Sequence, residues 1–173
     1  KALLEDEESD LALIHVSSHG YVSSLGGYLV TQDAAQYEEG VAFNDIIIYA
    51  NNSPIKEIVI ILDCCRSGNL GDIAITKNQH ATIRKGVSIL TSSNANQESM
   101  EKGGAGIFTD LLINALKGGN SDLLGNVKLT HLYEHADRML GPWKQRPTFK
   151  TNSSRLSVLR KAEPKIKYHI LKC

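Results

Sequence analysis

The chain has 173 residues, 42% of them hydrophobic and 22% charged, which is typical of one globular domain with its own core. Lys and Arg together number 19, as do Asp and Glu, so the formal net charge is zero. Nucleic acids and anionic membranes attract proteins with an excess of positive charge. We therefore expect neither of them as a partner.

The cysteines and the lengths of the hydrophobic runs indicate the cellular location of the protein and the kinds of site it contains. Three cysteines, two of them adjacent, do not make a disulfide framework, which predicts a reducing, cytoplasmic location. No apolar run reaches the roughly 18 residues of a membrane span. No C-x2-C pair is present to complete the usual spacing of zinc ligands, so no metal site is expected.

Three short apolar segments are predicted to be strands: Leu11–Ser17, Glu57–Asp63 and Gly86–Ser92. The second is continuously apolar, as in a strand covered on both faces. Between the first two, residues 26–34 predict a hairpin-like excursion. Residues 40–52 follow and predict a short helix. Its inward and terminating residues are expected to be Ile46, Ile47 and Ala50, and Asn51, Asn52 and Pro54, respectively.

Two further helices are predicted after the third strand. In residues 105–119 the apolar side chains recur with helical spacing, and Gly118 is expected to end the helix. Residues 129–140 repeat the pattern, with Thr130 as the expected cap and Met139 among the inward residues. The inward positions of the two helices are Phe108, Leu111, Leu112, Ala115 and Leu116, then Leu132, Ala136, Met139 and Leu140. Residues 154–160 predict a last strand.

Buried strands that alternate with helices imply an α/β fold with a mostly parallel sheet and helices on both faces. Right-handed crossovers bring the carboxyl ends of the strands to one edge, where ligands and chemistry collect in such sheets. His19 follows the first strand, and Cys64 and Cys65 follow the second. The sequence therefore predicts that the histidine and the thiols are neighbours.

The segments 17–20 (SSHG) and 63–68 (DCCRSG) contain the components of a nucleophilic site. A thiol attacks a carbonyl as the thiolate, so it needs a base, and histidine is the usual base near neutral pH. Backbone N–H groups must also face the oxyanion that forms, and glycine lets the backbone come close to a substrate.

With residues 15–21 (HVSSHGY) ahead of 63–68, the chain resembles the caspase-like cysteine peptidases, above all metacaspases and their bacterial relatives. Residues 26–34, 88–116 and 129–149 continue the resemblance. It implies a three-layer caspase-like fold in which further strands precede the histidine strand on a segment elsewhere. It also implies one peptidase domain over residues 1–173, in which a large-subunit-like region (residues 1–68), a linker (residues 69–85) and a small-subunit-like region (residues 86–173) follow one another.

The resemblance implies specific catalytic roles. His19 corresponds to the general base and acid, and Cys65 corresponds to the nucleophile. The N–H groups of Gly20 and Cys65 correspond to the oxyanion hole. Arg66 departs from the pattern, because metacaspases commonly have histidine there.

The resemblance also implies substrate-binding residues: Asp63, Ser18 and Ser92. Asp63 matches an acid that lines the pocket for the residue before the scissile bond, which favours Arg or Lys by charge pairing. The loop after the third strand has Ala95 and Asn96 where metacaspases often have acids. A preference for a neutral or apolar residue therefore remains the alternative.

These residues predict a cysteine endopeptidase that cleaves protein substrates through an acyl-enzyme. The family implies regulated proteolysis in a cell-death or defence response. Activation would involve calcium, cleavage of the linker, or the chain's own N-terminal segment or an activating domain. The candidate linker sites are Lys77, Arg84 and Lys85. No other cofactor is expected.

Several alternatives remain open. The chain is alternatively an inactive module that only binds partners, or a redox domain that uses Cys64 and Cys65, although vicinal cysteines form strained disulfides. Cys64 is expected to pack in the core, and His15 is expected to be structural. Asp63 is alternatively a cap that accepts backbone N–H groups, and the linker is alternatively an uncut surface loop.

Overall fold

The computed structural model describes residues 2–23, 26–33, 40–64, 82–92, 101–102, 105–141, 146–153 and 155–166. Its main sheet has the strand order β1 (Leu11–Ser17), β5 (Glu57–Asp63), β6 (Val87–Thr91) and β10 (Thr148–Thr151). The first three strands run parallel and β10 runs antiparallel to β6. The predicted strands and the mostly parallel sheet are therefore confirmed.

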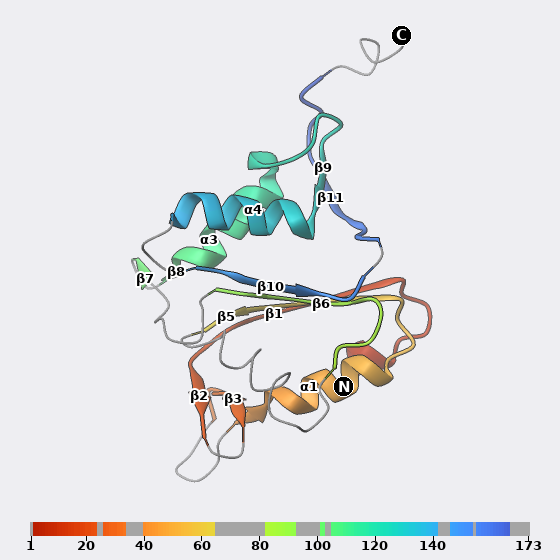
Figure 1. Cartoon of the computed structure of the whole chain (residues 1–173), viewed down its shortest axis with the longest axis vertical. Coiled ribbons are helices and arrows are strands. Elements are labelled where there is room, and N and C mark those ends of the chain that lie inside the picture. Colours follow the sequence, from red (N-terminus) through yellow and green to blue (C-terminus); the bar gives the residue numbers. More distant parts are fainter. Residues whose placement is uncertain are drawn as a thin grey trace.

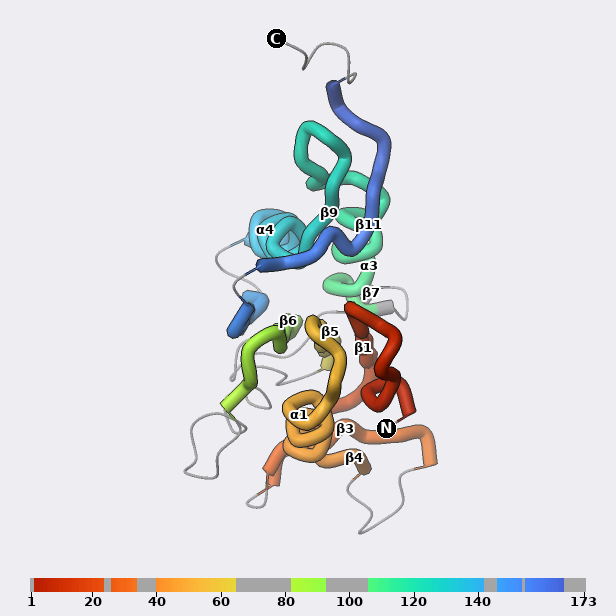
Figure 2. The backbone as a smooth tube through the Cα atoms, turned by 90° about the vertical axis from the view of Figure 1, so that its right-hand side faces the viewer, coloured from red at the N-terminus to blue at the C-terminus, as the bar shows by residue number. Residues whose placement is uncertain are grey.

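Helices cover both faces of this sheet. Helix α1 (Phe43–Asn52) lies on one face, and α3 (Ile107–Asn114) and α4 (Leu129–Leu140) lie on the other (Figure 1). The view turned by 90° shows the same order of layers, with the sheet between α1 and the α3–α4 pair (Figure 2). The expected three-layer α/β architecture is what the structure shows.

Shorter elements surround these layers. The three-stranded sheet of β2 (Gly20–Val22), β3 (Gly27–Leu29) and β4 (Val41–Ala42) contains the expected hairpin. A ribbon pairs β9 (Asn126–Lys128) with β11 (Val158–Lys161). The remaining elements are η1 (Ala2–Glu5), β7 (Glu101–Lys102), β8 (Ala105–Gly106) and η2 (Ala115–Gly119).

Strand β5 lies at the centre of two cores. Successive side chains of a strand point to opposite faces. Ile60 and Leu62 accordingly pack in the core under α1, and Val59 and Ile61 pack in the core under α3 and α4. This is why the segment is apolar at every position from Ile58 to Leu62.

Strand β1 differs because it forms an edge of the described sheet. Ala12, Ile14 and Val16 pack against the α1 core, whereas Leu13 and His15 on the opposite face are exposed. An edge strand pairs on one side only, so its other backbone groups stay available. Among the described residues, the histidine strand is therefore an edge strand of the main sheet.

Helix α1 ends at Asn52, within the predicted stop of Asn51, Asn52 and Pro54. Other local predictions were wrong. Helix α4 begins at Leu129 with Lys128 as its N-cap, so Thr130 lies inside the helix. Met139 is 60% exposed, because His135 and Leu129 occupy the buried flank instead.

The last predicted strand was right in type and wrong in place. It begins only at Val158 and pairs with β9 outside the main sheet. The fourth strand of the main sheet is β10, and no prediction covered it. Gly118 has a φ of 106°, which suits glycine, and it lies in η2 directly beyond α3.

Candidate active site

The carboxyl ends of β1 and β5 lie side by side. Ser17 is paired with Asp63 in the parallel ladder, and the Ser18 N–H donates to the Asp63 carbonyl at 3.2 Å. His19 is the next residue of the chain, so it lies at the same edge as Asp63 and Cys64. The expected neighbourhood of the two strand ends is confirmed. Cys65 itself lies outside the described residues.

The backbone around His19 is fixed by the β2–β3 hairpin. The His19 carbonyl accepts a hydrogen bond from the Val30 N–H at 2.9 Å and another from the Ser18 Oγ at 3.3 Å. Gly20 pairs with Leu29 in the same hairpin. The backbone is thus held while the side chain of His19 is exposed, as access to a substrate requires.

Two polar contacts fix the backbone that leads from β5 into Cys65. The Ser92 N–H donates to the Leu62 carbonyl at 2.9 Å, and the Ser92 Oγ donates to the Cys64 carbonyl at 3.4 Å. The Cys64 side chain is buried in the α1 core, as expected. Ser92 is buried as well, and a direct contact between Ser92 and substrate stays a prediction.

Asp63 is a buried acid, with 4% of its surface exposed. Its Oδ2 accepts two hydrogen bonds from Thr109, one from the hydroxyl at 2.5 Å and one from the backbone N–H at 3.2 Å. Thr109 lies in the first turn of α3, where unpaired N–H groups favour negative charge. The carboxylate therefore caps a helix through a residue 46 positions further along the chain.

Gly106 makes room for this carboxylate. A Cβ atom at position 106 would lie 2.1 Å from the Asp63 Oδ2, which is far inside van der Waals contact. The backbone of Gly106 has φ −65° and ψ 123°, a conformation that any residue adopts. The glycine is therefore needed for space and not for its conformational freedom.

His15 completes a row of polar groups on this face. Its Nε2 lies 3.2 Å from the Thr109 Oγ1. Because the threonine hydroxyl has one proton and gives it to Asp63, the histidine Nε2–H is the donor in this contact. His15 is exposed, so the row runs from the exposed face of β1 to the buried acid.

Sequence reasoning missed Thr109 and Gly106. The one local signal is a helix start with glycine at the N-cap and no capping oxygen there. Such a start predicts that an acceptor comes from elsewhere. It does not say that the acceptor is Asp63, since only the tertiary structure brings that residue to α3.

Arg84, a candidate processing site, has an extensively bonded side chain. Its guanidinium donates to the carbonyls of Ala50, Ser53, Ile55 and Lys85 at distances between 2.5 and 3.1 Å. Three of these carbonyls lie at or just beyond the end of α1. Cleavage after Arg84 or Lys85 stays a prediction. Lys77, Arg66, Ala95 and Asn96 lie outside the described residues.

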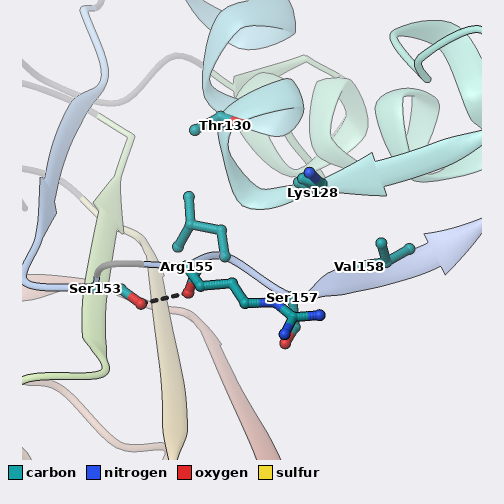
Figure 3. A pocket seen from close by; sticks show the side chains of 7 residues that line it. Lys128, Thr130, Ser153, Arg155, Ser157 and Val158 are labelled. Carbon is teal, nitrogen blue, oxygen red and sulfur yellow. Dashed lines mark hydrogen bonds between the residues drawn. The ribbon is translucent and has the colours of Figure 1, made fainter.

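A cavity of about 700 Å³ lies elsewhere (Figure 3). The Ser157 N–H and hydroxyl bind the carboxylate of Glu57, the first residue of β5, at 2.9 and 3.0 Å. Since Asp63 is the last residue of β5, the cavity lies at the opposite end of the sheet from the predicted site. It is lined by Lys128, Thr130, Ser153, Arg155, Leu156, Ser157 and Val158.

The described residues contain neither a metal cluster nor a membrane-spanning helix. No group of three or more His, Cys, Asp or Glu side chains lies close enough together among them to hold a metal ion. Helices long and apolar enough to cross a membrane are likewise absent from that portion of the chain.

Comparison with known families identifies the family of this chain. The family model of the caspase domain, peptidase family C14, matches residues 1–158. The chain belongs to the caspase family. Membership implies a cysteine-type peptidase, and hence a hydrolase with protein substrates. A comparison with curated proteins found no match.

Solved structures agree with the fold. A protein of Geobacter sulfurreducens has a TM-score of 0.60 and 15% sequence identity, covering 91% of this chain and 71% of its own. Caspase-1 from Spodoptera frugiperda has a TM-score of 0.62 and 17% identity, covering 90% of this chain and 65% of its own. The chain thus spans about two thirds of these structures, and at such identities the likeness shows the caspase-like fold alone.

Proposed function

We propose that this caspase-family chain is an active cysteine endopeptidase with His19 and Cys65 as its catalytic dyad. The observation that carries the proposal is the junction of β1 and β5. The Ser17–Asp63 pairing and the bond from Ser18 to Asp63 put His19 at the edge where β5 leads into Cys65. A base and a thiol that follow neighbouring parallel strands are suited to act on one substrate.

The proposed reaction has two halves. The Cys65 thiolate attacks the carbonyl carbon of the scissile peptide, and the N–H groups of Gly20 and Cys65 stabilise the oxyanion. His19 gives a proton to the leaving amine as the C–N bond breaks, which leaves a thioester. Water then attacks the thioester with His19 as base, and this step releases the acid and restores the thiol.

Asp63 is proposed to favour Arg or Lys before the scissile bond. The support is a buried carboxylate at the active edge, since a charge pair out of water is stronger than one on the surface. Ser18 is proposed to line the same pocket. A preference for an apolar residue is the alternative, and peptides distinguish the two.

The family membership supports a regulated role, proposed here as a cell-death or defence response in a reducing, cytoplasmic setting. Activation is proposed to come from the chain's own N-terminal segment, a partner domain, processing of the linker, or calcium. A dyad of thiol and imidazole needs no other cofactor for the chemistry itself.

The test uses fluorogenic peptides that end in Arg, Asp or Leu before the reporter, with and without calcium. Wild type, Cys65→Ala and His19→Ala are assayed together, with Cys64→Ala as the matched control for loss of a thiol. We expect cleavage after Arg that each dyad substitution reduces by at least about 10³-fold. Cys64→Ala should retain most of the activity.

Labelling by a peptidyl chloromethylketone supplies the second readout. The reagent should modify Cys65 alone, and only when His19 is intact. Protein that neither cleaves any peptide nor takes the label would contradict the proposal and favour an inactive interaction module.

A further inference from the structure

We propose that Thr109 is a positioning residue that sets the substrate selectivity of this peptidase by holding the Asp63 carboxylate. The inference rests on the proposed function and assigns a role within its active site to a residue of α3. The three groups involved are Asp63 at the end of β5, Thr109 in the first turn of α3, and Gly106 at its N-cap.

The first argument is the direction of the hydrogen bonds. Both Thr109 donors, the hydroxyl and the backbone N–H, converge on one oxygen, Oδ2 of Asp63. Two donors from one residue hold that oxygen in place, and bonds to a charged acceptor are the stronger kind. Neither bond involves Oδ1, so the inference gives that oxygen to the cationic substrate side chain.

The second argument is the space around the carboxylate. Oδ2, Cγ and Oδ1 of Asp63 would lie 2.1, 2.9 and 3.2 Å from a Cβ at position 106. The volume that a side chain would fill at Gly106 is thus occupied by the carboxylate. Since the backbone there suits any L-residue, alanine would displace the acid without straining its own φ and ψ.

The third argument is where the cap comes from. Helix N-caps are usually supplied by the residue just before the helix, but Gly106 has no side chain to do so. The acceptor is instead Asp63, two residues before Cys65. Thr109 therefore acts on the acid proposed for the substrate pocket, which a purely local cap would not do.

His15 has a smaller role in the same row. Its Nε2–H donates to the Thr109 hydroxyl at 3.2 Å and so directs the hydroxyl proton towards Asp63. His15 is exposed, so this bond competes with water and contributes less than the bonds to the buried acid. His15→Ala should shift selectivity in the same direction as loss of the hydroxyl, by a smaller factor.

The test compares Thr109→Val with Thr109→Ser on the peptides that end in Arg and Leu. Valine keeps the shape and removes the hydroxyl, whereas serine keeps the hydroxyl. For Thr109→Val we expect the Arg-to-Leu ratio of kcat/KM to fall about 10-fold, chiefly through a higher KM for the Arg peptide. Thr109→Ser should stay within about 2-fold of wild type.

Two further variants supply an independent test and a control. Gly106→Ala keeps Thr109 and displaces the carboxylate, so it should lower the same ratio even if Thr109→Val folds poorly. Thr130→Val changes a first-turn threonine of α4 near the opposite end of the sheet, and it should leave the ratio unchanged. Thermal unfolding of every variant separates selectivity from stability.

The outcomes are distinguishable. If Thr109→Val lowers cleavage of both peptides equally, Thr109 is only a structural cap and the inference is overturned. The inference also falls if Asp63→Asn abolishes the preference for Arg and Thr109→Val does not. If wild type prefers Leu, the role of Asp63 falls together with that of Thr109, and the dyad remains. Unlabelled, inactive wild type contradicts the proposed function itself.

Discussion

Helix α1 on one face of the sheet and helix α3 on the other are each held by one charged side chain, at opposite helix ends. Arg84 donates to carbonyls at the C-terminal end of α1, and Asp63 accepts from the N-terminal turn of α3. Each charge has the sign that its end of a helix dipole favours. The same physical device therefore appears twice, once as a cation and once as an anion.

The two charged residues lie at different ends of the parallel strands. Arg84 lies just before β6 begins, whereas Asp63 is the last residue of β5. Chemistry in parallel sheets collects at the carboxyl ends of the strands. We infer that Arg84 serves stability alone and that Asp63 serves stability and substrate choice.

The largest predicted effect is a loss of stability on substitution of Arg84, which would show the role of this residue in holding α1. Arg84→Met removes four side-chain hydrogen bonds, three of them to partly buried carbonyls at or just beyond the end of α1. We expect a loss of about 3 kcal/mol in the free energy of unfolding, measured by urea titration. The exposed Arg160 supplies the matched control, and Arg160→Met should change little.

The Arg84→Met substitution should lower stability without changing substrate selectivity. The Arg-to-Leu ratio of kcat/KM should be the same for Arg84→Met as for wild type at a temperature where both are folded. A change in that ratio would mean that both anchors act on the site, and the contrast between them would disappear.

Asp63→Asn should show the reverse pattern. The amide keeps the shape and removes the negative charge from the start of α3, so we expect a loss of about 1–2 kcal/mol in unfolding free energy. The preference for Arg over Leu should fall by at least about 10-fold. An Asp63→Asn protein that is less stable and equally selective would make the acid a cap and nothing more.

His135 is a buried polar residue that, unlike Arg84 and Asp63, has a ring nitrogen without a hydrogen-bond partner among the described residues. The residue is 6% exposed, and among the described residues its Nδ1 has no hydrogen-bond partner. Burial, and secondarily the nearby Arg138, lower the pKa of His135 from its ordinary value. The unfolded chain then binds more protons than the folded chain as the pH falls below about 6.5.

Stability should therefore decline as the pH falls from about 7 to 5, with a slope of at most about 1.4 kcal/mol per pH unit from this one group. His135→Leu should flatten that decline in thermal unfolding measured across the pH range. His131→Leu is the matched control on the same helix. An unchanged pH dependence in His135→Leu would show that other groups cause the decline.

The smallest effect is expected for an exposed charge pair. Lys56 lies 2.7 Å from Asp10, with both side chains largely in water. The Asp10 carboxylate raises the pKa of Lys56 through a hydrogen bond and charge attraction. Such pairs contribute little, so Lys56→Gln should leave the melting temperature unchanged. A clear drop in the melting temperature would show that an exposed charge pair stabilises the fold without hydrogen bonds to backbone groups.

The strands of the sheet and the edge at which the site lies were predictable, because both follow from local sequence patterns. Residues 11–17 and 57–63 are mostly apolar runs of strand length, and both strands have the expected bounds. His19 and Asp63 could be assigned to one edge from topology alone, since parallel strands end together.

The missed features depend on tertiary contacts. Thr130 has the chemistry of a cap but lies inside α4, and Asp63 caps a helix that begins 44 positions after it, at Ile107. The sequence pattern records which side chains are polar, and it does not record which strand end faces which helix. Asp63 was accordingly assigned both a pocket role and a capping role, without its partner Thr109.

The bonds of Arg84 have a consequence for a chain cut in its linker. A break in the linker ahead of Arg84, such as one after Lys77, would produce a second piece that contains Arg84. That piece would still be joined to the first by the guanidinium on the α1 carbonyls and by the pairing of β6 with β5. A nicked molecule should therefore migrate as two bands under denaturing conditions and elute as one particle under native conditions, so that proteolysis changes its covalent state without taking it apart.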